Sequence, residues 1–149
     1  MNYWRMQLHP CAPGSAAQHA SQSLQAGFIG LDFNDDCGDL SKVSMDDIDI
    51  GQKDYVQFWR DMRIDDRVLI MVHHFPFAIV DVAGEYNYIK NTEPEIGVWF
   101  RHFRRVKNVK FYADFITNAN CWSQIVMTDT ISILRDASSK SYQLIDSWK

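Results

Sequence analysis

Alternating apolar and polar residues at the start of the chain predict a strand. Residues Tyr3–Leu8 place Trp4 and every second neighbour on one apolar face, which is the period of a strand with one buried side. Ser15 stands at the N-cap position of a helix predicted over Ala16–Ala26, and Gly27 follows as its left-handed C′ residue. The chain is therefore expected to begin with a strand and a helix.

Short apolar runs predict a series of further strands: Phe28–Phe33, Arg67–His74, Phe77–Val82, Tyr86–Ile89, Trp99–Val106 and Val109–Thr117. A helix is predicted from about Gln52 to Met62. A turn at Ile64–Asp66 leads into Arg67–His74, and Phe77–Val82 follows so closely that it is the expected hairpin partner.

Weaker patterns mark the last part of the chain. Gln124–Leu134 predicts a helix, and Tyr142–Ile145 predicts a strand that closes the sheet. Many short strands in succession, with helices near both ends, favour a small barrel over a doubly wound sheet. We therefore predict one domain over residues 1–149 of the α+β class, a small curved mixed β-barrel with flanking helices.

Charge adds one local contrast to this picture. The chain has 15 Lys and Arg against 19 Asp and Glu, a net charge of −4, so bulk charge does not draw it to nucleic acid. Five of those 15 cations nevertheless fall within Arg101–Lys110. Such a strip either lies solvated on a half-exposed strand, or holds a few phosphates while neighbouring aromatic rings hold a base.

Signatures of several catalytic classes are absent from the sequence. It has no phosphate-cradling GxGxxG or GxxxxGK[ST] loop and no GxSxG nucleophile turn. The acidic segment 32–54 lacks the spacing and the final Glu of a calcium loop. His73 and His74 are adjacent, so on a strand they would point to opposite faces and would not easily share a metal. We expect no metal, no cofactor, and a chain that is not itself an enzyme.

Compartment is indicated only indirectly. No apolar run reaches the ~18 residues of a membrane span, and the polar start does not resemble a signal peptide. Three widely spaced cysteines suit free thiols in a reducing compartment. We therefore expect a cytoplasmic protein.

Aromatic side chains gather on the predicted strands. For each one alone, packing in the core is the commoner role. A few of them at a barrel mouth can instead form a cage for a flat base extruded from its stack, with polar side chains hydrogen-bonded to the base edge.

The order of four segments resembles the PUA-like superfamily: YWRMQLHP, AGFIGLDF with GDLSK, DRVLIMVHHFPFAIVDVAGEYNYI, and VWFRHFRRVKNV. They are most similar to the EVE and YTH-like domains at the N-terminus of McrB-type modification-dependent restriction proteins. The likeness covers about residues 3–110. It implies a small curved barrel with a pocket for a flipped modified base, such as a methylated cytosine or adenine, and a basic rim that holds the backbone.

Carried over by position, the resemblance implies pocket positions at Trp4, Leu31, Asp32, His73, His74, Tyr86 and Tyr88, and a basic run at Arg101, Arg104 and Arg105. We add Phe33 and Phe75 to the predicted base pocket, and Lys107 and Lys110 to the predicted phosphate contacts. Within the pocket, we assign the stacking walls to Trp4, Phe33 and Phe75, while Asp32, His73 and His74 read the base edge or hold the loop in place. Leu31 stands where the family often has an aromatic wall, which leaves the identity of the base open.

We therefore predict a reader of a modified base in nucleic acid, with DNA preferred to RNA, that supplies specificity to a restriction or defence effector. Two other classes stay open. One is an RNA reader on the same fold. The other is a small-molecule-binding domain or enzyme built around His73, His74 and the acidic segment. A pure interaction module is a third alternative.

Overall fold

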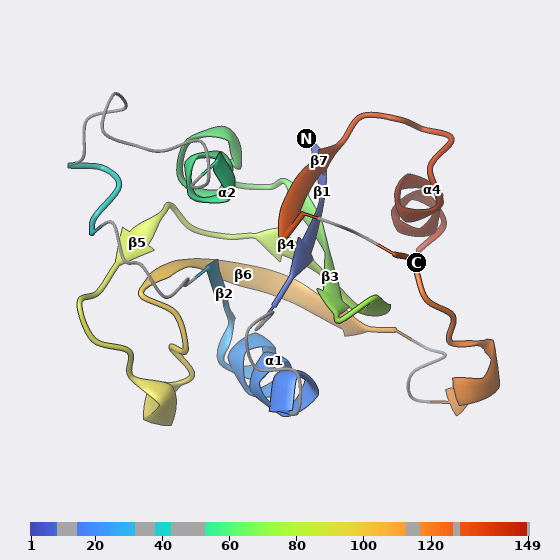
Figure 1. Ribbon diagram of the computed structural model, residues 1–149, viewed down its shortest axis with the longest axis horizontal. Coiled ribbons are helices and arrows are strands. Elements are labelled where there is room, and N and C mark those ends of the chain that lie inside the picture. Colours follow the sequence, from blue (N-terminus) through green and yellow to red (C-terminus); the bar gives the residue numbers. More distant parts are fainter. Residues whose placement is uncertain (9–14, 32–37, 43–52, 113–116, 127–128, 149) are drawn as a thin grey trace.

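The computed structural model describes residues 1–8, 15–31, 38–42, 53–112, 117–126 and 129–148 (Figure 1). Its strands are β1 Tyr3–Gln7, β2 Phe28–Leu31, β3 Arg67–Val72, β4 Phe75–Val82, β5 Asn87–Tyr88, β6 His102–Phe111 and β7 Ile131–Leu134. Its helices are α1 Ala16–Ala26, α2 Lys53–Val56 with its π-helical continuation η4 Gln57–Asp61, the 3₁₀ turns η5 Pro94–Ile96 and η6 Ala119–Cys121, and α4 Lys140–Ser147. No helix in the described ranges is long and apolar enough to span a bilayer.

One mixed sheet organises the molecule. Its strand order is β2-β6-β4-β3-β1-β7, and β5 pairs with β6 beside this path. β1 and β3 are parallel, and the other pairs are antiparallel. The sheet curls into a half-barrel with helices packed against it (Figure 1). The predicted α+β class with a curved mixed sheet is confirmed.

The two faces of the sheet carry separate apolar clusters. The inner face carries the main core, to which α1 contributes Leu24 and the α2–η4 helix contributes Tyr55 and Phe58. The outer face carries a smaller cluster in which Ile79 of β4 meets Ile145 of α4. Any side chain of the sheet can therefore be assigned to the side of α1 and α2 or to the side of α4.

Local signals in the first half of the chain are confirmed. α1 spans the predicted residues, and Gly27 has φ of 89° with its N–H donating to Leu24 O at 3.0 Å. Ser15 precedes the helix without a side-chain cap bond. β3 and β4 form the predicted hairpin, in which Val72 pairs with Phe75 across a two-residue turn.

Both C-terminal predictions are wrong. Ile131–Leu134, predicted as helix, is β7 and pairs with the edge of β1. Its alternating β-branched residues suit a strand once an open edge is available. Tyr142–Ile145, predicted as strand, lies in α4, where the Ser139 hydroxyl accepts a hydrogen bond from Tyr142 N at 3.2 Å. That N-cap starts the helix.

Two predicted strands, 99–106 and 109–117, are replaced by one. β6 runs from His102 to Phe111, and its register with β4 shifts between Ile79 and Asp81. Asn108 has φ of 54° at this bulge. Asn tolerates the left-handed region better than most residues, so the strand continues past an irregularity that the sequence pattern reads as a break.

Candidate functional site

Three neighbouring strands align one row of side chains at the β5 end of the sheet. Leu31 of β2 pairs with His102 of β6, and His102 pairs with Tyr88 of β5 on its other side. Paired residues share a face and strands lie ~4.8 Å apart, so Leu31 and Tyr88 flank His102 with roughly 10 Å between them. We call these three residues the His102 row. It lies on the inner face and contains two of the predicted pocket residues.

Aromatic rings surround the buried imidazole of His102. The ring centroids of Tyr55, Tyr88 and Tyr86 lie 4.5, 5.0 and 5.9 Å from that of His102. The Tyr86 hydroxyl is 2.6 Å from His102 Nδ1 and accepts a hydrogen bond from Leu40 N at 3.1 Å. When the hydroxyl donates to Nδ1, the neutral imidazole carries its proton on Nε2. The result is an oriented imidazole inside a cluster of rings, of which Tyr86 and Tyr88 are half-buried.

His102 was missed by the sequence reasoning. It follows Arg101 in the basic strip Arg101–Lys110, which was interpreted only as a phosphate-binding segment. Strand alternation places His102 on the same face as Val106, a core residue, and that was the available signal. Its neighbours Leu31 and Tyr88 come from distant segments, so only the pairing of the strands reveals the row.

Gly30 sets the close approach of β2 to β6. A Cβ at Gly30 would lie 2.5 Å from Phe100 Cβ and closer still to the carbonyl oxygen of His102. No side chain fits at that separation, so the position accepts only glycine. The next residue, Leu31, is thereby held in register with His102.

Trp4 lies in the core, and its assignment as a stacking wall is wrong. It is 0% exposed, and its Nε1 donates to Asp66 Oδ2 at 2.9 Å. Asp66 is also buried and accepts from the backbone N–H groups of Asn2 at 2.9 Å and Arg63 at 3.0 Å. This network joins β1 to the turn before β3, which is a structural role.

We expect Trp4→Phe to lower the free energy of unfolding by about 1–2 kcal/mol, because the buried indole hydrogen bond is lost and the Asp66 carboxylate accepts one hydrogen bond fewer. Its preference among nucleic-acid ligands should equal that of the wild type, since Trp4 does not face a ligand. Urea denaturation and fluorescence anisotropy measure the two quantities. A folded Trp4→Phe protein with altered preference would return Trp4 to the ligand site.

Three predicted pocket residues lie at the opposite end of the sheet. His73 and His74 form the β3–β4 turn, and the Phe75 ring packs against Trp122 at 4.5 Å. This turn lies beyond the C-terminal end of β6, whereas Tyr88 pairs at its N-terminal end (Figure 1). A ten-residue strand spans about 30 Å. The prediction that these residues share one pocket with the two tyrosines is wrong.

Two further predicted residues, Asp32 and Phe33, lie outside the described residues, as does most of the acidic segment 32–54. In the part of the chain that the structure describes, no three His, Cys, Asp or Glu side chains gather as metal ligands.

Arg104 is buried, and its assignment to phosphate binding is wrong. It is 1% exposed on the inner face of β6. Its guanidinium donates to four backbone carbonyls, those of Phe58 at 2.9 Å, Trp59 at 2.8 Å, Met62 at 2.8 Å and Gly84 at 3.0 Å. Burial lowers the pKa of this guanidinium. Three of these carbonyls belong to the end of the α2–η4 helix, so Arg104 acts as its C-cap.

The exposed cations of β6 point away from the His102 row. Strand alternation places Arg105 and Lys107 on the outer face, and the bulge at Asn108 brings Lys110 to the same face. The Arg105 guanidinium lies 5.7 Å from the centre of the Phe28 ring, and Lys107 Nζ is 2.9 Å from an Asp65 carboxylate oxygen at the surface. These residues do not form a rim around the His102 row.

Other cations lie closer to the row. Arg101 directly precedes His102, and its carbonyl accepts from Ile89 N at 2.9 Å. Lys90, which follows Ile89, is exposed. Lys42 is also exposed and stands two residues after Leu40, whose N–H donates to the Tyr86 hydroxyl. The sequence reasoning missed both lysines, because each stands alone in its segment.

No protein family and no curated protein matches this chain. Among solved structures, the chain is similar to the YTH domain of the Zygosaccharomyces rouxii MRB1 protein, solved in complex with N6-methyladenosine RNA. The TM-score is 0.51 and the identity 12%, over 99% of this chain and 88% of that chain. The likeness shows that the chain has a YTH-like fold, as the sequence resemblance implies.

Proposed function

We propose that this chain binds nucleic acid and recognises a modified base at the His102 row. One combined observation carries the proposal. The aromatic cluster around His102 stands on a fold shared with a domain that was solved holding N6-methyladenosine RNA. The chain supplies binding and orientation, with no catalytic step of its own.

A base at this row would stack on the aromatic rings that surround His102. The backbones of Leu31 and Tyr88 stand roughly 10 Å apart, and the His102 imidazole lies between them. Tyr55 of α2 lies over His102 in this structure, and both side chains are buried. A base that enters past half-buried Tyr88 therefore replaces the Tyr55 ring, which exchanges one ring contact for another. Recognition then requires α2 to shift.

Two observations bear on whether the ligand is DNA or RNA, and they favour different answers. The sequence resemblance to EVE domains of restriction proteins favours DNA and an associated defence effector. The YTH neighbour was solved with RNA, which favours an RNA reader as the second candidate. For either form, we assign the phosphate contacts to Arg101, Lys90 and Lys42. Each lies within two residues of a residue paired with, or hydrogen-bonded to, the aromatic cluster around His102.

A panel of short oligonucleotides tests the proposal. Matched RNA and DNA strands carry one methylated, hydroxymethylated or plain base at a fixed position, and fluorescence anisotropy gives each Kd at a stated salt concentration. At least one modified strand should bind more tightly than its plain counterpart. Equal Kd values across every matched pair would overturn the proposed function and leave only the fold.

We expect Tyr88→Ala to reduce the preference for the modified strand by about tenfold, because stacking of a base on an aromatic ring is worth on the order of 1–3 kcal/mol. Tyr142→Ala is the matched control. Tyr142 is a half-buried tyrosine of α4 on the outer side of the sheet, so its loss should leave the preference unchanged. Equal effects of the two variants would contradict a specific role of the row.

A further inference from the structure

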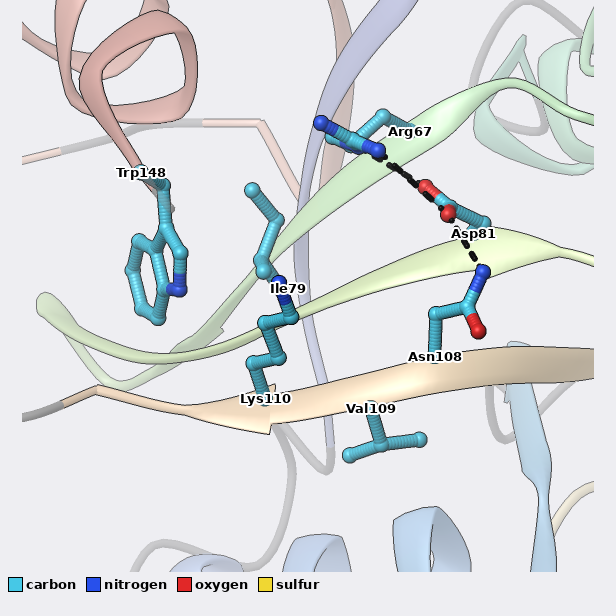
Figure 2. Close-up of a pocket in the computed structure, with 7 residues that line it drawn as sticks. All are labelled: Arg67, Ile79, Asp81, Asn108, Val109, Lys110 and Trp148. Atoms are coloured by element: carbon cyan, nitrogen blue, oxygen red, sulfur yellow. Dashed lines mark hydrogen bonds and ion pairs between the residues drawn. The ribbon is translucent and has the colours of Figure 1, made fainter.

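A pocket of about 240 Å³ lies on the outer face of the sheet, away from the His102 row (Figure 2). Its main lining residues are Arg67, Ile79, Asp81, Asn108, Lys110 and Trp148. At ~30 Å³ per molecule in liquid water, the space equals about eight waters. It has room for one ring system, and the remaining groups of a larger ligand would lie outside it.

A hydrogen-bonded chain of side chains forms one wall. Arg67 Nε donates to Asp81 Oδ1 at 2.8 Å, and Asn108 Nδ2 donates to Asp81 Oδ2 at 3.0 Å. Burial disfavours the charged form of Asp81, but the bonds from Arg67 and Asn108 outweigh it and hold the pKa of Asp81 below its ordinary value. Because Arg67 and Asp81 neutralise each other, Lys110 leaves the pocket with a net positive charge.

Lys110 is the cation available to a ligand. It is exposed, and within the described ranges its ammonium makes no side-chain hydrogen bond or ion pair. An ammonium in this state offers donors to an anion such as a phosphate oxygen. Lys110 therefore favours an anionic occupant of the pocket.

The bulge in β6 shapes the polar wall. Asn108 has φ of 54° at the register shift between β4 and β6. Bulges redirect side chains and are frequent beside functional sites. Here the Asn108 amide nitrogen is held by Asp81, which leaves its carbonyl oxygen as the acceptor of that side chain.

Trp148 forms the opposite wall. Figure 2 shows its indole across the pocket from the Arg67–Asp81–Asn108 chain, with Ile79 and Lys110 between the two walls. The indole is half-buried, and its ring packs against Tyr112 with centroids 5.1 Å apart. A ring anchored in this way and still partly exposed is a stacking surface for another flat group.

We propose that this outer pocket binds one nucleotide, with its base against Trp148 and its phosphate on Lys110. The indole selects a flat ring over a plain anion, and the ammonium selects a phosphorylated nucleoside over a nucleoside. The Asn108 carbonyl oxygen accepts a hydrogen bond from an amino group on the base edge. The site lies on the opposite face from the His102 row and needs no modified base, so it goes beyond the proposed reader function.

Isothermal titration calorimetry of the full chain tests the site. The probes are the four ribonucleoside 5′-monophosphates, the corresponding nucleosides, and inorganic phosphate. At least one monophosphate should bind more tightly than both its nucleoside and phosphate. Trp148→Leu, which keeps an apolar side chain, should weaken the monophosphate and the nucleoside by about tenfold. Lys110→Gln should weaken the monophosphate and leave the nucleoside unchanged.

Controls separate this site from the reader site. Lys140→Gln removes an exposed lysine of α4 outside the pocket and should bind every probe as the wild type does. Tyr88→Ala should also keep monophosphate binding, whether or not it loses preference for a modified strand. Lys110 is exposed, so Lys110→Gln gives a folded protein even if Trp148→Leu does not.

Three outcomes would overturn the assignment: no monophosphate binds better than phosphate, Lys110→Gln binds every probe as the wild type does, or Tyr88→Ala abolishes monophosphate binding. A short plain single strand distinguishes the source of the nucleotide. Tighter binding of the strand, with the same dependence on Trp148, assigns the site to a nucleotide within a strand. Tighter binding of the monophosphate assigns it to a free nucleotide.

Discussion

Arg104→Ala is expected to lower the free energy of unfolding by about 4 kcal/mol or more, because each buried carbonyl left without a donor costs about 1–3 kcal/mol. The guanidinium donates to four backbone carbonyls, two buried and two part-buried, at distances of 2.8 to 3.0 Å. Domains of this size have only about 5–15 kcal/mol of stability in total, so the variant should be partly unfolded at 37 °C.

The reason for so large an effect lies in how the α2–η4 helix ends. Met62 N donates to Gln57 O at 2.9 Å, which is a π-helical bond, and the carbonyls of the last turn have no further helical donors. Arg104 supplies the donors from β6 and brings a positive charge to the helix C-terminus. Arg104→Lys should also destabilise the protein, since one ammonium cannot reproduce the planar fork of the guanidinium.

Arg105→Ala is the matched control, because it removes the neighbouring arginine from the outer face. The cation–π contact with Phe28 is worth about 0.5–1 kcal/mol at an exposed site, so the stability loss should stay within that range. Urea denaturation followed by circular dichroism measures both variants. Similar losses for Arg104 and Arg105 would refute the capping role.

Gly30→Ala is expected to lower the free energy of unfolding by about 3 kcal/mol and to weaken modified-base recognition. Overpacking a filled site typically costs about 1–3 kcal/mol, and here the backbone of β2 must also move. The added Cβ would meet the Phe100 side chain and the carbonyl oxygen of His102. Relief requires β2 to separate from β6, which displaces Leu31 from its place beside His102. Thermal unfolding and the oligonucleotide panel measure the two effects.

Gly84→Ala provides the comparison for Gly30. A Cβ at Gly84 would approach Arg105 Cβ at 3.3 Å, and the exposed arginine can shift by a few tenths of an ångström. We expect a change in stability within about 0.5 kcal/mol, as for most surface substitutions. A Gly30→Ala protein as stable as Gly84→Ala, with unchanged preference among strands, would show that the close approach of β2 is not needed.

Local structure was predictable wherever one segment carried its own signal. The alternation of Tyr3–Leu8, the Gly27 C′ residue and the β3–β4 hairpin depend on residues within a few positions of each other, so pattern alone identified them. The C-terminal segments failed because their state depends on distant partners. Ile131–Leu134 becomes a strand through the edge of β1, which no local pattern reveals.

The predicted site residues likewise depend on distant partners. Tyr88 and Leu31 were predicted from the sequence resemblance, and pairing on both sides of β6 brings them together around His102. His73 and Trp4 were assigned to the pocket from the same resemblance, yet His73 lies at the far end of the sheet and Trp4 lies in the core. Residue type indicates what a side chain can do, and strand pairing determines which side chains can do it together.

The basic strip shows most clearly what sequence and tertiary structure each decided. The sequence by itself determined that five cations cluster in one segment, that the chain forms a curved mixed sheet, and that its strands carry many aromatic rings. Only the tertiary structure decided that Arg104 points inward to cap a helix, whereas Arg105 and Lys110 point outward. The physical reason is that adjacent residues of a strand face opposite sides, and which side is the interior depends on what packs there. The bulge at Asn108 then reverses the alternation, so that Lys110 faces outward like Arg105.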